Sequence, residues 1–272
     1  MSGKLFVTGT PIGNLSDFSP RAIETLQQCD FIAAEDTRVT RKLLTHFEIS
    51  TPLVSYHEHN KREKGQQIIE RILGGENCAI VTDAGMPAIS DPGQDLVDLA
   101  LSHGITVVSV PGPTAFATAL AISGMDSRTF TFVGFLDVDK KKRREQLDFI
   151  NTQPCTVILY EAPHKLSSTL RDLLEALGDR HLCIAREITK IHEEIIRTTL
   201  AEAVEAYPNN DLKGEIVLIL EGAKKESRTF TIEDAKSMAE DMISSGMSKN
   251  DAAKAAAKET GLKKSDIYKL LF

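Results

Sequence analysis

Short apolar runs alternate with amphipathic helical patterns along most of this 272-residue chain, and this alternation limits the folds that it can adopt. Each apolar run has the length of one buried strand, and the segments between them carry apolar residues at helical spacing. Such alternation is typical of βαβ units, in which helices pack on largely parallel sheets. The sequence therefore predicts an α/β fold.

The expected elements can be read from these runs. The expected strands are residues 5–7, 31–34, 79–81, 105–110, 156–160, 182–185 and 216–220. The expected helices are residues 19–29, 38–47, 61–73, 93–103, 114–123, 142–150, 164–177 and 231–245. Proline follows Ser19, Asp91 and Ala162, which favours helix starts at these three points, with Asp91 as an acidic N-cap.

The pattern changes twice along the chain and predicts three parts. We expect an N-terminal α/β domain over 1–117, a second α/β domain over 118–224 and a helical C-terminal module over 225–272. The Thr-Phe-Thr-Phe alternation within 129–135 indicates that the second sheet is partly antiparallel. Beyond residue 222 the pattern is purely helical and predicts two or three short helices after the last strand.

Composition narrows the class of protein. Apolar residues make up 42% and charged residues 26%, which is ordinary for a soluble globular protein. No apolar run approaches the roughly 20 residues of a membrane span, and no secretory leader pattern is visible at the start. The four cysteines form no CxxC pair. We therefore expect reduced thiols and a cytoplasmic location.

The charge is unevenly distributed. The net charge of −7 argues against indiscriminate nucleic-acid binding. Residues 140–144 nevertheless read Lys-Lys-Lys-Arg-Arg, and residues 245–272 carry six lysines against three acids. Such local basic charge is expected of a protein that docks on phosphates at particular places. The alternative is that these residues form an ordinary solvated surface.

Three loops rich in Gly and Pro follow expected strands directly, at residues 9–13, 83–93 and 111–114. In open α/β sheets, ligands bind at the carboxyl ends of the strands. Glycine lets the backbone approach a ligand closely, and helix N-termini present free N–H groups. We expect the loops to line one crevice. None is a Walker loop or a GxGxxG turn, which argues against a Rossmann dehydrogenase.

Polar clusters accompany these loops. The cluster at 35–38, Glu-Asp-Thr-Arg, either caps a helix with Arg38 paired to Glu35, or faces the crevice. The His-Glu-His segment at 57–59 lacks the third ligand that zinc needs, so we predict no metal and a polar loop near a substrate.

Eight segments together resemble a known family. In order they are TPIGNL (10–15), EDTR (35–38), DAGMPAISDPG (83–93), PGPTA (111–115), GF (134–135), YEAPHKL (160–166), REITK with HEE (186–194) and KGEIV (213–217). They closely resemble the group of small-subunit ribosomal RNA methyltransferases I in the tetrapyrrole-methylase superfamily. One departure is that the group usually has Phe-Leu-Pro after the Gly of GF, whereas here Leu136 is followed by Asp137-Val138-Asp139.

The resemblance implies a fold and an activity. The fold is that of a tetrapyrrole-methylase-like, class III methyltransferase, with two α/β domains, S-adenosyl-L-methionine in the cleft between them and a homodimeric assembly. The activity is 2′-O-methylation of the ribose of a decoding-centre cytidine, cytidine-1402, in the 16S ribosomal RNA of the small subunit. The implied cofactor contacts are Pro11, Ile12, Asp83, Ala84, Gly85, Met86, Ile89, Thr114, Ala115, Tyr160, Glu161, Gly214 and Glu215.

Methyl transfer from a sulfonium is an in-line displacement that needs no metal. Good positioning contributes about 7–11 kcal/mol, and a general base on the ribose hydroxyl adds about 10²–10⁴-fold. Glu35, Asp36 and Lys190 are candidates for catalytic groups because they lie at strand ends. The expected RNA contacts are Arg38, Lys61, Arg62, Lys140, Lys141, Lys142, Arg143 and Arg144.

Two alternatives remain from the sequence. One is a methylase of a small molecule, a tetrapyrrole, although a small macrocycle needs no basic docking surface. The other is a non-catalytic ribosome-binding factor that keeps the fold, which absence of S-adenosylmethionine binding would favour.

Overall fold

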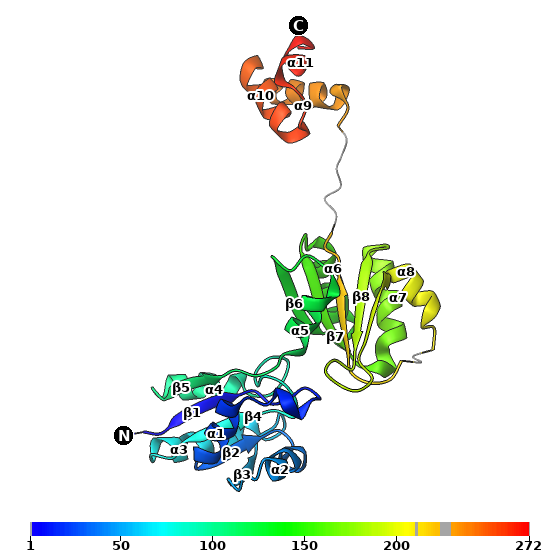
Figure 1. The fold of residues 1–272 in the computed structure, drawn as a ribbon. Helices are drawn as coiled ribbons and strands as arrows, with labels where there is room; N and C mark the ends of the chain where they lie inside the picture. The colour runs from blue at the N-terminus through cyan, green and yellow to red at the C-terminus, as the bar shows by residue number, and fades with distance from the viewer. Residues whose placement is uncertain (1, 210–211, 224–229, 272) are drawn as a thin grey trace. The chain divides into compact units, whose positions relative to one another are not determined.

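The computed structural model describes residues 2–209, 212–223 and 230–271. The chain divides into two compact units, Met1–Ala223 and Lys224–Phe272 (Figure 1). Each unit has its own hydrophobic core. The expected domain boundary between 224 and 225 lies outside the described residues.

The first sheet of the larger unit has five parallel strands in the order β3-β2-β4-β1-β5. They are β1 (Lys4–Thr8), β2 (Phe31–Ala34), β3 (Leu53–Ser55), β4 (Cys78–Val81) and β5 (Thr106–Val110). The apolar runs of β2 and β4 are buried along their whole length. Because all five strands run the same way, the loops that follow them meet at one edge of the sheet.

Helices cover both faces of this sheet. Helices α3 (Lys61–Leu73) and α4 (Gln94–Ser102) pack on one face, and α1 (Pro20–Gln28) and α2 (Thr37–His46) on the other. A short 3₁₀ turn, η1 (Leu15–Asp17), precedes α1. Ser19 caps α1 with Pro20 at its first position, as the sequence predicts.

The second sheet is mixed, in the order β6-β7-β10-β8-β9. Its strands are β6 (Phe130–Phe135), β7 (Thr156–Glu161), β8 (His181–Arg186), β9 (Glu194–Thr199) and β10 (Ile216–Leu220). Strand β10 pairs antiparallel with β7 and β8, and β9 pairs antiparallel with β8, so the prediction of a partly antiparallel sheet is confirmed. Strand β6, whose alternation prompted that prediction, pairs parallel with β7. Strand β6 lies at the edge of the sheet, and most of its residues are exposed or half-buried.

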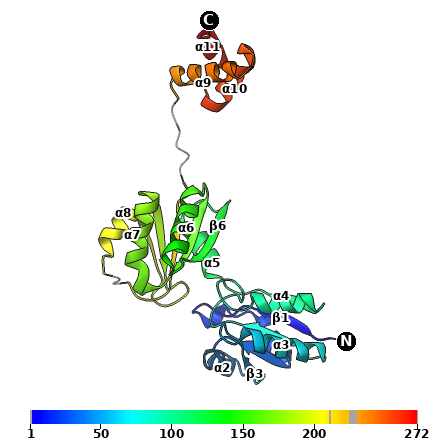
Figure 2. The same cartoon turned by 180° about the vertical axis from the view of Figure 1, so that it is seen from behind.

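Helices also cover both faces of the second sheet. Helices α6 (Lys140–Thr152), α7 (Leu166–Leu177) and α8 (Leu200–Ala206) pack on one face (Figure 2). Helix α5 (Ala115–Ser123) packs on the other, and the turn η2 (Pro163–Lys165) leads into α7. The expected boundary between 117 and 118 falls inside α5.

The smaller unit consists of helices α9 (Ile232–Ser244), α10 (Lys249–Thr260) and α11 (Lys264–Lys269) in its described part. Its core is built largely from alanines, namely Ala235, Ala239, Ala252, Ala253 and Ala256. Small side chains let short helices approach closely, and Gly261 ends α10 in a left-handed conformation. The prediction of short helices after the last strand is confirmed.

Strands β3 and β9, helix α8 and the 3₁₀ turn η1 were not expected from the sequence. Strand β3 has three residues and α8 has seven, which is too short to display a clear period. Strand β9 is half-exposed and carries Glu194 and Arg197, so it lacks an apolar run. None of the helices that the structure describes is long and apolar enough to cross a membrane.

Candidate active site

The loops that follow β1, β4 and β5 are joined by backbone hydrogen bonds at the carboxyl edge of the first sheet. The N–H of Thr10 donates to the carbonyl oxygen of Gly85 at 2.9 Å, and the N–H of Gly85 donates back to Thr10 at 3.2 Å. The N–H of Gly9 donates to the carbonyl oxygen of Val110 at 3.0 Å. The three Gly- and Pro-rich loops therefore form one continuous wall, as the sequence predicts.

Two glycines make this contact possible. A Cβ atom built on Gly112 would lie 2.8 Å from the Cα of Gly9, and one built on Gly9 would lie 2.7 Å from the Cα of Gly112. The opposing atoms are backbone and cannot rotate away. The central loop is also strained, because Ala88 and Ser90 adopt positive φ angles of 69° and 65°. Such strain concentrates at ligand sites, where the surroundings hold it in place.

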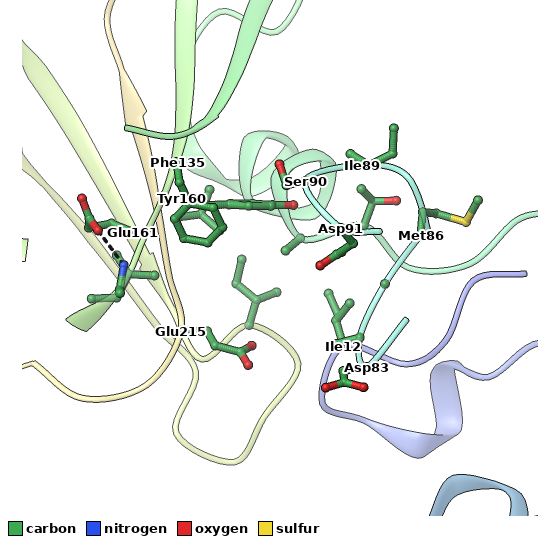
Figure 3. A pocket seen from close by; sticks show the side chains of 18 of the residues that line it. Ile12, Asp83, Met86, Ile89, Ser90, Asp91, Phe135, Tyr160, Glu161 and Glu215 are labelled. Carbon is green, nitrogen blue, oxygen red and sulfur yellow. Dashed lines mark hydrogen bonds between the residues drawn. The ribbon is translucent and has the colours of Figure 1, made fainter. Parts of the chain in front are cut away.

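These loops and the second sheet enclose a cavity of about 420 Å³ (Figure 3). Pockets for small molecules and cofactors are roughly 300–1,000 Å³. The lining residues are Ile12, Glu35, Asp83, Ala84, Gly85, Met86, Ile89, Ser90, Asp91, Thr114, Ala115, Phe135, Tyr160, Glu161, Ala162, Pro163, Ile188, Glu215, Ile216 and Val217.

The structure brings most of the expected cofactor contacts to this cavity. Eleven of the thirteen residues implied by the resemblance line it, and the two that do not are Pro11 and Gly214. Pro11 is buried beside Ile12. Gly214 has a φ of 94° and packs against the side chain of Glu187.

The cavity is acidic. Among the described residues that line it, five are Asp or Glu and none is Lys, Arg or His. Asp83 and Asp91 face Glu215 across the cavity (Figure 3). Burial, and then the charge of Asp83, raise the pKa of Glu35. Burial likewise raises the pKa of Asp83. Crowded carboxylates of this kind favour a cationic ligand.

Asp91 has a different role from the one that the sequence suggests. Helix α4 begins at Gln94 with Gly93 as its N-cap, so the prediction that Asp91 caps this helix is wrong. Gly93 has a φ of 143°, a turn that separates Asp91 from the helix axis. The Asp91 carboxyl is hydrogen-bonded to Thr82 instead, and burial followed by the charge of Glu35 raises the pKa of Asp91 to about 7.

Two lining residues on β7 are held by hydrogen bonds. The hydroxyl of Tyr160 accepts a hydrogen bond from the N–H of Phe116, in the first turn of α5, at 3.2 Å. Glu161 is 5% exposed, accepts from the N–H of Ala162 at 2.7 Å and accepts from the hydroxyl of Thr169. Its charge is therefore engaged by protein donors. The carboxylates of Asp83, Asp91 and Glu215 also have protein partners, but they are oriented toward the cavity.

The three candidate catalytic groups occupy different positions. Glu35 lines the cavity. Asp36 does not; it caps α2 and pairs with Arg38 at 2.6 Å, and the hydrogen bonds from Arg38 lower the pKa of Asp36. Of the two alternatives for residues 35–38, helix capping is thus observed, but the partner of Arg38 is Asp36 rather than Glu35. The Nζ atom of Lys190 lies 2.9 Å from Glu187 and 3.2 Å from the lining residue Glu215.

The basic residues expected at an RNA surface also differ from one another. Lys61 is paired with Glu58 at 2.7 Å and with Asp95 at 2.6 Å. Arg143 is 17% exposed in its side chain and pairs with Asp172 at 2.6 Å.

The rest of the basic run sits at the start of α6. Lys142 lies 3.9 Å from Asp137. No ion pair among the described residues involves Lys140, Lys141 or Arg144 of this run, or Arg62 on α3. The unusual Asp137-Val138-Asp139 segment provides the N-cap of α6, because Asp139 accepts from the N–H groups of Lys141 and Lys142.

In the described part of the chain, no group of three or more His, Cys, Asp or Glu side chains is arranged to hold an ion. The rings of His57 and His59 lie 6.0 Å apart in an edge-to-face arrangement. The four cysteines are free thiols, and Cys155 is the one that is not buried.

Several lining residues were not singled out as contacts from the sequence, among them Ser90, Phe135, Ile188 and Val217. All four lie within motifs that the sequence analysis recognised, so taking every residue of each motif as a candidate contact would have included them. Val217 is part of a buried strand, and its sequence does not distinguish a residue that lines a cavity from one that fills a core.

Comparisons with known proteins agree with this geometry. The sequence profile of the Tetrapyrrole (Corrin/Porphyrin) Methylases matches residues 4–204. The Ribosomal RNA small subunit methyltransferase I of Halalkalibacterium halodurans is 47% identical over 272 residues, with 98% of this chain and 94% of the relative covered. The protein of the same name from Synechocystis sp. is 44% identical, with 98% and 97% covered.

Solved structures share the fold at low identity. A uroporphyrin-III C-methyl transferase from Thermus thermophilus, complexed with S-adenosyl homocysteine, superimposes with a TM-score of 0.58 at 17% identity over 80% of this chain and 97% of that one. The methyltransferase CobJ gives 0.63 at 19% identity, with 82% and 95% covered. The chain therefore belongs to the tetrapyrrole methylase family and, within it, to the group of ribosomal RNA small subunit methyltransferases I.

Proposed function

We propose that this chain transfers the methyl group of S-adenosyl-L-methionine to the ribose 2′-oxygen of cytidine-1402 in the 16S ribosomal RNA of the small subunit. The observation that carries the choice of RNA is the 47% identity along nearly the whole chain to a relative with this name, helices after residue 223 included. The two solved methylases compared above cover 80% and 82% of the chain.

The cavity fits the proposed cofactor in size and charge. Its volume of about 420 Å³, apolar walls and carboxylates suit an amphipathic, positively charged molecule. Bound there, S-adenosylmethionine supplies an electrophilic methyl on a sulfonium. Ile12, Met86 and Ile89 provide apolar contact, and the carboxylates of Asp83, Asp91 and Glu215 attract the cation. We retain Pro11 and Gly214 as proposed contacts through the backbone next to the lining.

Among the candidate catalytic groups, Glu35 suits the role of proton acceptor best. It lines the cavity, and its raised pKa makes it a stronger base than an ordinary carboxylate. Asp36 is a weak base because Arg38 lowers its pKa. Burial lowers the pKa of Lys190, but its hydrogen bond to Glu187 and the charge of Glu215 outweigh burial and raise it. Lys190 therefore stays protonated, and we propose that it positions Glu215.

The remaining expectations are part of the same proposal. The RNA would contact Arg38, Lys61, Arg62 and residues 140–144, with those side chains that have no carboxylate partner contributing most. We also propose a homodimer, a cytoplasmic location and a division of the larger unit into two α/β domains at α5.

One experiment tests the function. Purified protein is incubated with methyl-labelled S-adenosylmethionine and small ribosomal subunits from a strain that lacks this methylation, and with a uroporphyrinogen in a parallel reaction. We expect label in the RNA, and mass spectrometry should find one added 2′-O-methyl on the cytidine. Label in the tetrapyrrole alone would contradict the proposal, and absence of cofactor binding in calorimetry would favour a non-catalytic ribosome-binding factor.

A further inference from the structure

The exposed face of helix α2 forms a shallow hollow lined by Thr37, Arg38, Arg41, Lys42 and Thr45. These residues recur at helical spacing, so they form one stripe, whereas Thr40 and Leu44 face the sheet and are buried. Arg38, Arg41 and Lys42 are exposed. From Thr37 to Thr45 the stripe extends about 12 Å along the helix at a rise of 1.5 Å per residue.

The stripe carries cations that the protein does not neutralise. Helix α2 contains Arg38, Arg41, Lys42 and His46, and no Asp or Glu. Arg38 has a partner in Asp36. Neither Arg41 nor Lys42 has a carboxylate oxygen within 4.0 Å of its side-chain nitrogens in the described residues. Like charges three and four residues apart repel one another on a helix, so this arrangement favours binding of an external anion.

The stripe begins at the wall of the cavity. Glu35 lines the cavity, Asp36 caps α2, and Thr37 is the first residue of the helix. The N–H of Asp36 also donates to the carboxylate of the lining residue Asp83 at 3.2 Å. An anion on this face of α2 is therefore held at a fixed position relative to the site of methyl transfer.

The chemistry of the stripe suits a chain of phosphates. The guanidinium of an arginine matches the geometry of a phosphate with two parallel N–H donors, and a lysine adds a point charge. A single small anion would use one of these groups, whereas cations repeated over about 6 Å, from Arg38 to Lys42, suit a polymer with repeated charges. The target of the proposed function is such a polymer, and its reactive 2′-oxygen lies within one nucleotide of a backbone phosphate.

We infer that the face of α2 formed by Thr37, Arg38, Arg41, Lys42 and Thr45 binds the phosphate backbone of the ribosomal RNA strand that carries the target ribose. This inference rests on the proposed function and extends its RNA surface to Arg41 and Lys42. The face of α2 holds the strand, and the cavity beside it holds the methyl donor.

The test measures how salt affects binding of small ribosomal subunits and of protein-free small-subunit RNA. Variants Arg41→Gln, Lys42→Gln and the double variant are compared with wild type. Glutamine is a good helix former, and these side chains are exposed, so folding should be unaffected and is checked by thermal melting. Each lost phosphate contact should reduce the slope of log affinity against log salt by about 0.7–0.9.

The same slope sets the size of the loss. The ionic contribution to binding vanishes at about 1 M salt. A slope that is smaller by about 0.7–0.9 therefore corresponds to a loss of affinity of about 5- to 8-fold per residue at 0.1 M salt. Arg41→Lys keeps the charge and should keep the slope. Lys4→Gln is the matched control, because Lys4 is an exposed cation at the amino end of β1, away from the loops of the cavity.

The outcomes separate this inference from the proposed function. If wild type methylates the subunits but the double variant keeps the wild-type slope, the face of α2 does not bind phosphate and the inference is overturned. If the variants weaken binding of whole subunits but not of protein-free RNA, the face contacts a ribosomal protein and the inference is also overturned. If wild type binds S-adenosylmethionine in calorimetry but does not methylate the subunits, the proposed function is what has failed.

Discussion

Replacing Asp91 by Asn tests whether a carboxylate that is placed in the cavity to attract a cationic ligand lowers the stability of the folded protein. Burial, and then the charge of Glu35, raise the pKa of Asp91 from 3.8 to about 7. At about 1.4 kcal/mol per pKa unit, the ionised side chain would cost up to about 4 kcal/mol. Asp91 is partly exposed, so water screens much of this cost, and we expect about 1–2 kcal/mol.

The pH dependence follows from these pKa values. Below about pH 4, Asp91 is protonated in both the folded and the unfolded chain, and it carries no penalty. Between about pH 4 and pH 7 the unfolded chain loses this proton first, so the folded state loses stability as the pH rises. Asn is neutral throughout. The variant should therefore melt about 2–8 °C above wild type at pH 8 and close to wild type at pH 4.5.

Cofactor binding should change in the opposite direction. Ionised Asp91 attracts a cation, so the affinity of wild type for S-adenosylmethionine should rise between pH 6 and pH 8, by at most about tenfold per pH unit. The variant should bind more weakly with a flatter profile. Scanning calorimetry without ligand and titration calorimetry with the cofactor measure the two effects. Asp98→Asn, on the exposed side of α4, removes the same charge outside the cavity and is the control. A variant that melts at or below wild type at pH 8, with unchanged affinity, would refute the reasoning.

Three further substitutions test the framework around the cavity. Gly112→Ala should lower stability by more than about 2 kcal/mol and abolish cofactor binding, because the new Cβ meets the backbone of Gly9; a normal melting temperature would contradict this. Tyr160→Phe should lower stability by about 0.5–1.5 kcal/mol and weaken cofactor binding, because the N–H of Phe116 loses its acceptor. Urea unfolding measures the first effect and titration calorimetry the second. Ile150→Ala should cost about 2–5 kcal/mol in urea unfolding because Ile150 is fully buried, yet it should leave cofactor affinity unchanged because Ile150 does not line the cavity.

The sequence by itself determined those features whose signals are local. The apolar runs of β2 and β10 coincide with the expected ranges, and helix α3 begins and ends as its period predicts. The Gly- and Pro-rich loops follow the strands directly, and parallel strands place such loops at one edge. For this reason the crevice could be predicted before any contact was known. Arg41 and Lys42 were within reach of the same reasoning, since they lie three and four residues beyond Arg38.

Only the tertiary structure decided which charges face the cavity and which are neutralised. Asp91 sits before a proline and reads as a helix cap, but the φ of Gly93 turns the chain away and leaves the carboxyl in the cavity. Arg143 belongs to an exposed-looking basic run, yet its guanidinium is held by Asp172, 29 residues further along the chain. Local sequence sets the backbone period, whereas the partner of a side chain depends on how distant segments pack, and pKa values and free charge follow from that packing.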